Sequence, residues 1–139
     1  MKVLVSSCVM GRNCKYNGGN NYNPSVMEFL KDKEVIEICP ELLSGLPTPR
    51  PSAELVDGIV MSMDGENVDK EYRRGVDLAL KEIEDMEIDL VILQSRSPTC
   101  GVNQVYDGSF TGKLVVGQGL FAQALIKAGY KVVDAADFR

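Results

Sequence analysis

The sequence predicts an α/β domain with a mainly parallel, Rossmann-like sheet, flanking helices and a small β-hairpin. Short runs rich in β-branched residues and leucine alternate with amphipathic segments, which is the order of elements in α/β proteins. Hydrophobic residues make up 45% of the chain and charged residues 25%, as in soluble globular proteins. Its 139 residues are close to the size of one domain. We therefore expect a single α/β domain over residues 1–139.

The first half of the chain predicts two strands around one short helix. Lys2–Ser6 is a β-branched and leucine-rich strand, and residues 11–23 form a long loop without periodicity. An Asn-Pro pair opens a helix over Pro24–Lys33, and Glu34–Cys39 is the second strand. Pro40–Pro51 contains four prolines and a glycine, so it is neither a long helix nor a central strand. We expect a structured loop there.

The second half predicts a hairpin, two longer helices and two strands. Glu54–Met63 contains an Asp-Gly pair, which favours a two-residue hairpin turn. Val68–Met86 has apolar residues at helical spacing with charges between them. Ile88–Leu93 is nearly all apolar, as expected for a strand covered on both faces, and a loop with several reactive side chains follows it. Gly117–Ala128 is the last helix, and Lys131–Val133 is the last strand.

Composition excludes several classes of function. The net charge is −5 and the isoelectric point is near 4.8, which argues against nucleic acid as a partner bound through its phosphates. Apolar runs are far shorter than the roughly 18 residues that span a bilayer, and the first residues are too short an apolar stretch for a secretory signal. We expect a cytoplasmic protein. The chain has no histidine, which excludes histidine-based catalytic groups and metal ligands.

Four cysteines are the remaining candidates for chemistry: Cys8, Cys14, Cys39 and Cys100. In a reducing compartment they favour metal or catalytic roles over disulfides. Three of them follow predicted strands, and ligands of parallel sheets collect beyond the carboxyl ends of strands. Converging thiolates favour a soft metal centre, either zinc or an iron-sulfur cluster. The alternative is that the cysteines are ordinary buried side chains.

Several short motifs around these cysteines resemble those of a bacterial family of domains of unknown function that includes the iron-sulfur thiouracil desulfurases. The resemblance covers essentially the whole chain, and the motifs occur in the order and at the approximate spacing of the family. They are Val5–Gly11 with Lys15–Gly18, Cys39–Glu41 with Gly45–Pro51, and Ser97–Gly101 with Tyr106–Gly112.

The resemblance implies a [4Fe-4S] cluster that is held by Cys8, Cys39 and Cys100, with one iron left free to take the sulfur of a substrate. It also implies that Glu41 and Ser97 handle protons. The implied reaction replaces carbon-bound sulfur by oxygen from water on a small thiolated heterocycle, so that 2-thiouracil gives uracil and sulfide. The cluster would act as a Lewis acid.

The chemistry of the two implied proton-handling residues agrees with those roles. Glu41 lies beside Cys39 in a proline-rich segment, where burial and nearby thiolates favour a protonated carboxyl that can donate a proton near neutral pH. The alternative is that Glu41 pairs with Arg50 at the loop surface. Ser97 precedes a proline, so its alternative role is to form a turn or a local cap.

Other polar residues near the cysteines are weaker candidates. Three arginines could offset cluster charge or hold an anionic substrate, with surface solvation as the alternative. Gly117–Gly119 could present backbone N–H groups to an anion but lacks a full phosphate-loop motif, so we expect only a helix start near the site. Three residues could line a base pocket or form turns. The arginines are Arg12, Arg50 and Arg96, and the pocket candidates are Asn103, Tyr106 and Asp107.

Cys14 leaves a second hypothesis open. A fourth thiolate would close the cluster or bind zinc, which suits a noncatalytic structural or interaction domain. We instead expect Cys14 to be a spare thiol that the long loop after Gly11 directs elsewhere. A thiol-redox protein is disfavoured because the sequence has no Cys-x-x-Cys pair.

Overall fold

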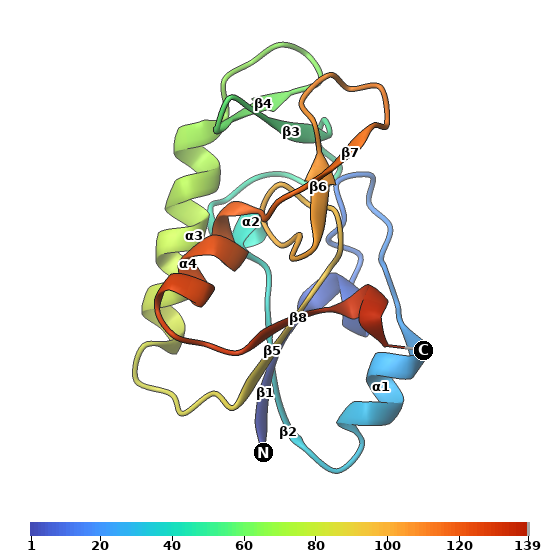
Figure 1. The fold of residues 1–139 in the computed structure, drawn as a ribbon, viewed down its shortest axis with the longest axis vertical. Helices are drawn as coiled ribbons and strands as arrows, with labels where there is room; N and C mark the ends of the chain where they lie inside the picture. Colours follow the sequence, from blue (N-terminus) through green and yellow to red (C-terminus); the bar gives the residue numbers. More distant parts are fainter. Residues whose placement is uncertain (139) are drawn as a thin grey trace.

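Four parallel strands form the central sheet in the computed structural model, which describes residues 1–138 (Figure 1). The strands lie in the order β2-β1-β5-β8, and every neighbouring pair is parallel. From β1 the chain continues to β2 on one side. It then returns to β5 on the other side of β1 and continues outward to β8, so the strand order reverses between β1 and β5. These strands are β1 (Lys2–Ser6), β2 (Glu34–Ile38), β5 (Leu90–Leu93) and β8 (Val132–Asp134). The predicted mainly parallel α/β sheet is confirmed.

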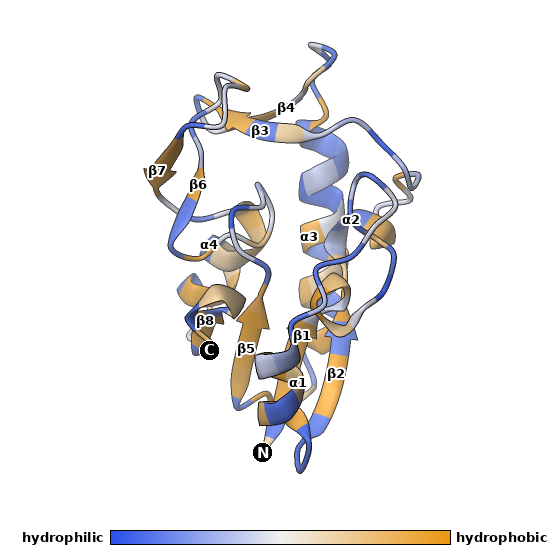
Figure 2. Ribbon diagram, turned by 90° about the vertical axis from the view of Figure 1, so that its right-hand side faces the viewer, coloured by the Kyte–Doolittle hydropathy of each residue, from blue (hydrophilic) through white to orange (hydrophobic). Residues whose placement is uncertain are grey.

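Helices cover both faces of the sheet, and the strands are the most apolar part of the ribbon in Figure 2. Alternate strand residues face opposite sides, so Leu4 and Leu93 join one core and Val5 and Ile92 join the other. The first core packs under α3 and α4, and the second packs under α1. The helices are α1 (Pro24–Leu30), α3 (Asp69–Ile83) and α4 (Leu120–Lys127).

Local sequence explains where the helices begin. The side chain of Asn23 accepts a hydrogen bond from the backbone N–H of Val26 at 3.1 Å and so caps α1, with Pro24 in the first turn. The predicted apolar spacing of α3 is confirmed, because Val76 and Ile83 are among the buried residues of its inner face. No helix within residues 1–138 has the length and apolar character needed to cross a membrane.

Two small antiparallel hairpins extend the fold beyond the carboxyl ends of the sheet strands (Figures 1 and 2). The first, β3 (Ala53–Val56) with β4 (Ile59–Ser62), was predicted, and Asp57 and Gly58 both adopt the left-handed backbone that its turn needs. The second, β6 (Gln104–Tyr106) with β7 (Leu114–Val116), lies in a segment that the sequence predicts as loop. Its strands are only three residues long, and β7 has no buried residue to create an alternating pattern.

The segment predicted as a structured loop after Cys39 contains one short helix, α2 (Pro40–Leu43). A proline is favourable in the first turn of a helix, and this helix of one turn ends before the next proline in the sequence. The ends of other elements match the prediction or differ from it by one to three residues, because periodicity does not define where an element ends. Two 3₁₀ turns, Ser7–Met10 and Ala135–Asp137, follow β1 and β8.

The contact between α2 and α3 depends on Gly75. A Cβ atom at this position would lie 2.0 Å from the carbonyl oxygen of Pro40. Alanine is favoured over glycine in a helix by about 1 kcal/mol, whereas overpacking costs up to about 3 kcal/mol. We therefore expect Gly75→Ala to lower the free energy of unfolding by about 2 kcal/mol.

Urea unfolding of Gly75→Ala measures this effect, with Asp77→Ala as the matched control because Asp77 is exposed on the same helix. The control should unfold at nearly the wild-type urea concentration. A Gly75→Ala protein that matches it would contradict the close contact between α2 and α3.

Candidate functional site

A cavity of about 480 Å³ lies where the carboxyl ends of β1, β2 and β5 meet. Its lining includes Ser6 at the end of β1, Ile38 at the end of β2 and Gln94 just after β5. The strand order reverses between β1 and β5, and such a reversal opens a crevice in which α/β proteins bind ligands. All four cysteines line the cavity.

Three different loops carry Cys8, Cys39 and Cys100 to this cavity. Cys8 lies in the 3₁₀ turn after β1, and Cys39 precedes the first residue of α2. Cys100 lies in the loop after β5 and is only 8% exposed. The structure thus brings together the three thiols that the strand order alone leads us to expect there.

Cys14 also reaches the cavity, so the expectation that its loop directs it elsewhere is wrong. Arg50 Nη2 donates a hydrogen bond of 2.9 Å to the carbonyl oxygen of Cys14 and fixes this loop against the site. The residue is 4% exposed. Its thiol interacts with the sulfur atoms of Cys8 and Cys39.

The thiols differ in how readily they ionise. Donation from the Cys14 thiol lowers the pKa of Cys8 to about 7 and also lowers the pKa of Cys39, although burial opposes both effects. The same hydrogen bonds, together with burial, raise the pKa of Cys14. Burial raises the pKa of Cys100 well above its usual value. Cys14 therefore ionises less readily than its neighbours Cys8 and Cys39.

The donor set fits an iron-sulfur cluster. All four cysteines are free thiols. Within the described part of the chain, no three cysteine or carboxylate side chains are arranged to hold a metal ion. A cluster differs from a single ion because each of its irons takes its own thiolate, so the ligands surround a larger body. Three loops that bring thiols to one roomy cavity meet this requirement.

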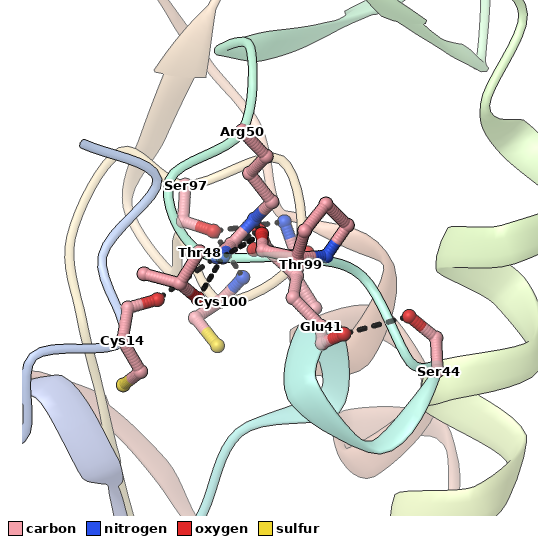
Figure 3. A network of polar contacts seen from close by, with 9 residues as sticks. Cys14, Glu41, Ser44, Thr48, Arg50, Ser97, Thr99 and Cys100 are labelled. Carbon is pink, nitrogen blue, oxygen red and sulfur yellow. Dashed lines mark hydrogen bonds and ion pairs between the residues drawn. The ribbon is translucent and has the colours of Figure 1, made fainter. Parts of the chain in front are cut away.

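Glu41 is held beside the thiols by an extensive polar network (Figure 3). Arg50 donates to Glu41 Oε1 from Nε at 3.0 Å and from Nη2 at 2.8 Å. The hydroxyl of Thr99 donates to Glu41 Oε2 at 3.0 Å. Arg50 also donates to the carbonyl of Pro47 and to the hydroxyl of Thr48. One buried arginine therefore fixes both the carboxylate and the loops around it.

The ion pair of Glu41 and Arg50 is buried, whereas the sequence alternative placed it at the loop surface. The Arg50 side chain is 4% exposed and the Glu41 side chain is 15% exposed. The guanidinium of Arg50 donates twice to Oε1 of Glu41 and so fixes the carboxyl group at the cavity, where the sequence predicts a proton-handling residue.

Ser97 lines the cavity and also forms the turn that the sequence offers as its alternative role. Its Oγ accepts hydrogen bonds from the backbone N–H groups of Thr99 at 3.0 Å and of Cys100 at 3.1 Å. A serine oxygen has two lone pairs, so both acceptor positions are used. The hydroxyl proton remains available for donation. Ser97 thus positions Cys100 and can donate a hydrogen bond into the cavity.

The loop that carries Cys100 is pinned by the start of α4. Backbone N–H groups of Leu120 and Phe121 donate to the carbonyl oxygens of Pro98 and Thr99 at 2.9 and 2.8 Å. A Cβ atom on Gly119 would lie 2.4 Å from the carbonyl carbon of Thr99, so only glycine permits this approach. The predicted helix start near the site thus has a packing role, because the cysteine loop takes up two of the first N–H groups of α4.

The weaker sequence candidates divide into those that line the cavity and those that do not. Arg12 forms an exposed ion pair with Glu37, away from the cavity. Asn103 bonds to Asp137, and Asp107 accepts hydrogen bonds from Ser109 in a turn. Two candidates line the cavity besides Arg50, namely Arg96 and Tyr106.

The cavity lining also includes residues that were not predicted as site residues, among them Glu54, Tyr72 and Phe110. Tyr72 falls at an apolar position of α3, so its spacing predicts a core residue. Burial, with the nearby charge of Glu41, raises its pKa. A buried tyrosine needs a hydrogen-bond partner for its hydroxyl, so a tyrosine at a core position could have indicated a polar site nearby. The places of Glu54 and Phe110 at the cavity depend on contacts between segments far apart in the sequence, so no local pattern predicts them.

Comparison with known proteins agrees with this geometry. The profile of the 2-thiouracil desulfurase family matches residues 3–137. The uncharacterized protein YbbK of Bacillus subtilis (strain 168) is 35% identical over 142 residues, which covers 95% of this chain and 94% of that protein. The solved structure of the [4Fe-4S]-dependent thiouracil desulfidase TudS is 32% identical, with a TM-score of 0.88 over 96% of this chain and 89% of that one. The chain therefore belongs to the 2-thiouracil desulfurase family.

Proposed function

We propose that this protein is a [4Fe-4S]-dependent desulfurase that replaces sulfur by oxygen on a small thiolated heterocycle such as 2-thiouracil. The observation that carries the proposal is the meeting of three thiols and a fixed carboxylate in one cavity. Membership of the 2-thiouracil desulfurase family and the similarity to TudS support the same chemistry. The overall reaction is 2-thiouracil plus water to uracil plus hydrogen sulfide, with no net change of oxidation state.

Cys8, Cys39 and Cys100 would hold the cluster. When bound, it supplies an iron without a protein ligand, a Lewis acid that can take a sulfur atom. Cys14 is the neighbouring thiol, and its single S–H can donate to Cys8 or to Cys39. In this proposal Cys14 is not itself a ligand.

Glu41 would accept a proton from the water that attacks the carbon bearing the sulfur. Its Oε1 is committed to Arg50, whereas Oε2 accepts the Thr99 hydroxyl and could accept a water with its second lone pair. Ser97 would donate a hydrogen bond to the ring and orient it, because both acceptor positions of its oxygen are occupied. Arg50 keeps Glu41 in place.

Anaerobic reconstitution with iron and sulfide tests the proposal. We expect the reconstituted protein to convert 2-thiouracil to uracil and hydrogen sulfide in equal amounts, measured by chromatography and by a sulfide assay. Protein without its cluster is the control and should release no sulfide. A protein that carries the cluster but leaves 2-thiouracil unchanged would contradict this substrate.

A further inference from the structure

The loop at the tip of the second hairpin lies beyond the carboxyl ends of the sheet strands (Figure 2), and its residues contribute to the lining of the cavity. This loop joins β6 to β7 and contributes Phe110 and Gly112 to the lining, next to Tyr106 at the end of β6. The cysteines reach the cavity on other loops, which follow β1, β2 and β5. The cavity is therefore lined both by thiols and by aromatic residues of the second hairpin.

Glu54 fixes this loop to the first hairpin. Its Oε1 accepts hydrogen bonds from the backbone N–H of Gly108 at 3.0 Å and of Phe110 at 3.1 Å. Glu54 is 9% exposed, so the two bonds lie largely out of solvent. A Cβ atom on Gly108 would lie 2.6 Å from the carbonyl oxygen of Leu55, which shows how closely the loop packs on β3.

The backbone of Phe110 is in a conformation that a phenylalanine rarely adopts. Its φ angle is 59°, in the left-handed region that favours glycine. Such a conformation costs of the order of 1 kcal/mol and persists only where the surroundings impose it. The hydrogen bond from the Phe110 N–H to Glu54 is one such restraint.

We propose that Phe110 forms an aromatic wall on which the planar ring of the substrate stacks, and that Glu54 is the positioning residue that holds Phe110 over the cavity. This inference rests on the proposed function, and it extends that function by assigning the groups that select a flat heterocycle. Bases stack on aromatic side chains with little dependence on sequence, because every base has a π face.

Two other aromatic residues of the cavity, Tyr72 and Tyr16, are less suited to this role. Tyr72 is buried next to Glu41 and Arg50, at the proton-handling side. Tyr16 is 43% exposed on the long loop after β1. Phe110 has no polar group of its own and is half-buried in a restrained loop. Its ring can therefore pack on a heterocycle without breaking any side-chain hydrogen bond.

Phe110→Leu in the reconstituted protein tests the proposal, because leucine keeps an apolar side chain and removes the ring. We expect KM for 2-thiouracil and Kd for uracil to rise about tenfold, with kcat within about twofold of wild type. Phe110→Tyr should restore both constants, since tyrosine keeps the stacking surface. Tyr22→Leu is the matched control, because Tyr22 is exposed and outside the cavity lining.

Uracil binding is measured by calorimetry and does not depend on turnover, so the two proposals can fail separately. Wild-type values of both constants in Phe110→Leu would overturn the stacking wall, even in an active desulfurase. Weaker uracil binding by Phe110→Leu in a protein that releases no sulfide would support the wall and count against the proposed reaction. A wild-type protein that binds neither base would overturn both.

The positioning role of Glu54 has its own test. Glu54→Gln keeps an acceptor oxygen for both N–H groups, whereas Glu54→Ala removes it. We expect the alanine variant to show the KM increase of Phe110→Leu together with faster hydrogen exchange at the amides of Gly108 and Phe110. The glutamine variant should stay close to wild type in both measurements. Unchanged exchange and KM in Glu54→Ala would overturn this role.

Discussion

Serine in place of Cys8, Cys39 or Cys100 is expected to prevent cluster binding and abolish sulfide release, whereas Cys14→Ser should retain about four irons per chain and remain active. The first three thiols come from three separate loops and would each hold one iron. Cys14 would instead donate its single S–H to Cys8 or to Cys39. Iron and acid-labile sulfide analysis after anaerobic reconstitution, with the visible spectrum, measures the outcome.

The Cys14 variant makes this comparison decisive. Serine keeps a hydrogen-bond donor of similar shape, so the two neighbouring thiolates lose little stabilisation. Loss of the cluster in Cys14→Ser would point to a fourth thiolate ligand and leave no iron open to substrate. That result would favour the structural domain with four cysteines over the desulfurase.

The second large effect concerns Glu41. We expect Glu41→Gln to bind the cluster yet release sulfide from 2-thiouracil 10²–10⁴ times more slowly, because a positioned proton acceptor contributes about that much to a rate. The measurement is single-turnover sulfide release at equal cluster content. Glu37→Gln is the matched control, since Glu37 is paired with an arginine outside the cavity.

A loss of stability must be separated from a loss of chemistry in this experiment. Removing one partner of a buried ion pair costs about 3 kcal/mol, so Glu41→Gln is expected to unfold at lower urea concentration. Glu41→Asp retains the charge next to Arg50 but withdraws the carboxylate by one methylene. A slow, folded and cluster-loaded aspartate variant would assign the effect to proton transfer. Near-wild-type rates in both variants would exclude Glu41 as the proton acceptor.

The place of the cysteines could be predicted because it follows from chain topology. Strand periodicity located the ends of β1, β2 and β5, and parallel strands present those ends at one edge. This was sufficient to expect Cys8, Cys39 and Cys100 together. Cys14 was misplaced because its loop is held by contacts with distant residues, including the hydrogen bond from Arg50, which no local pattern reveals.

The chemistry around the thiols was harder to predict. The sequence offered a pair of Glu41 and Arg50 only at the loop surface, whereas the structure buries that pair at the cavity. The two hydrogen bonds that Glu54 accepts from the loop of Phe110 were missed because they join two short hairpins that lack any common sequence signal. Periodicity reports which residues face a core, and it contains no information about which loops meet above a sheet.

The bonds that fix the site join parts of the chain that are distant in sequence. Arg50 lies 36 residues from Cys14, and Thr99 lies 58 residues from Glu41. Contacts of this kind form late in folding, since long loops must close before them. A zinc finger, in contrast, is unfolded until its metal binds. Here the sheet itself brings the three loops together, so we expect cluster insertion to act on a chain that is already folded.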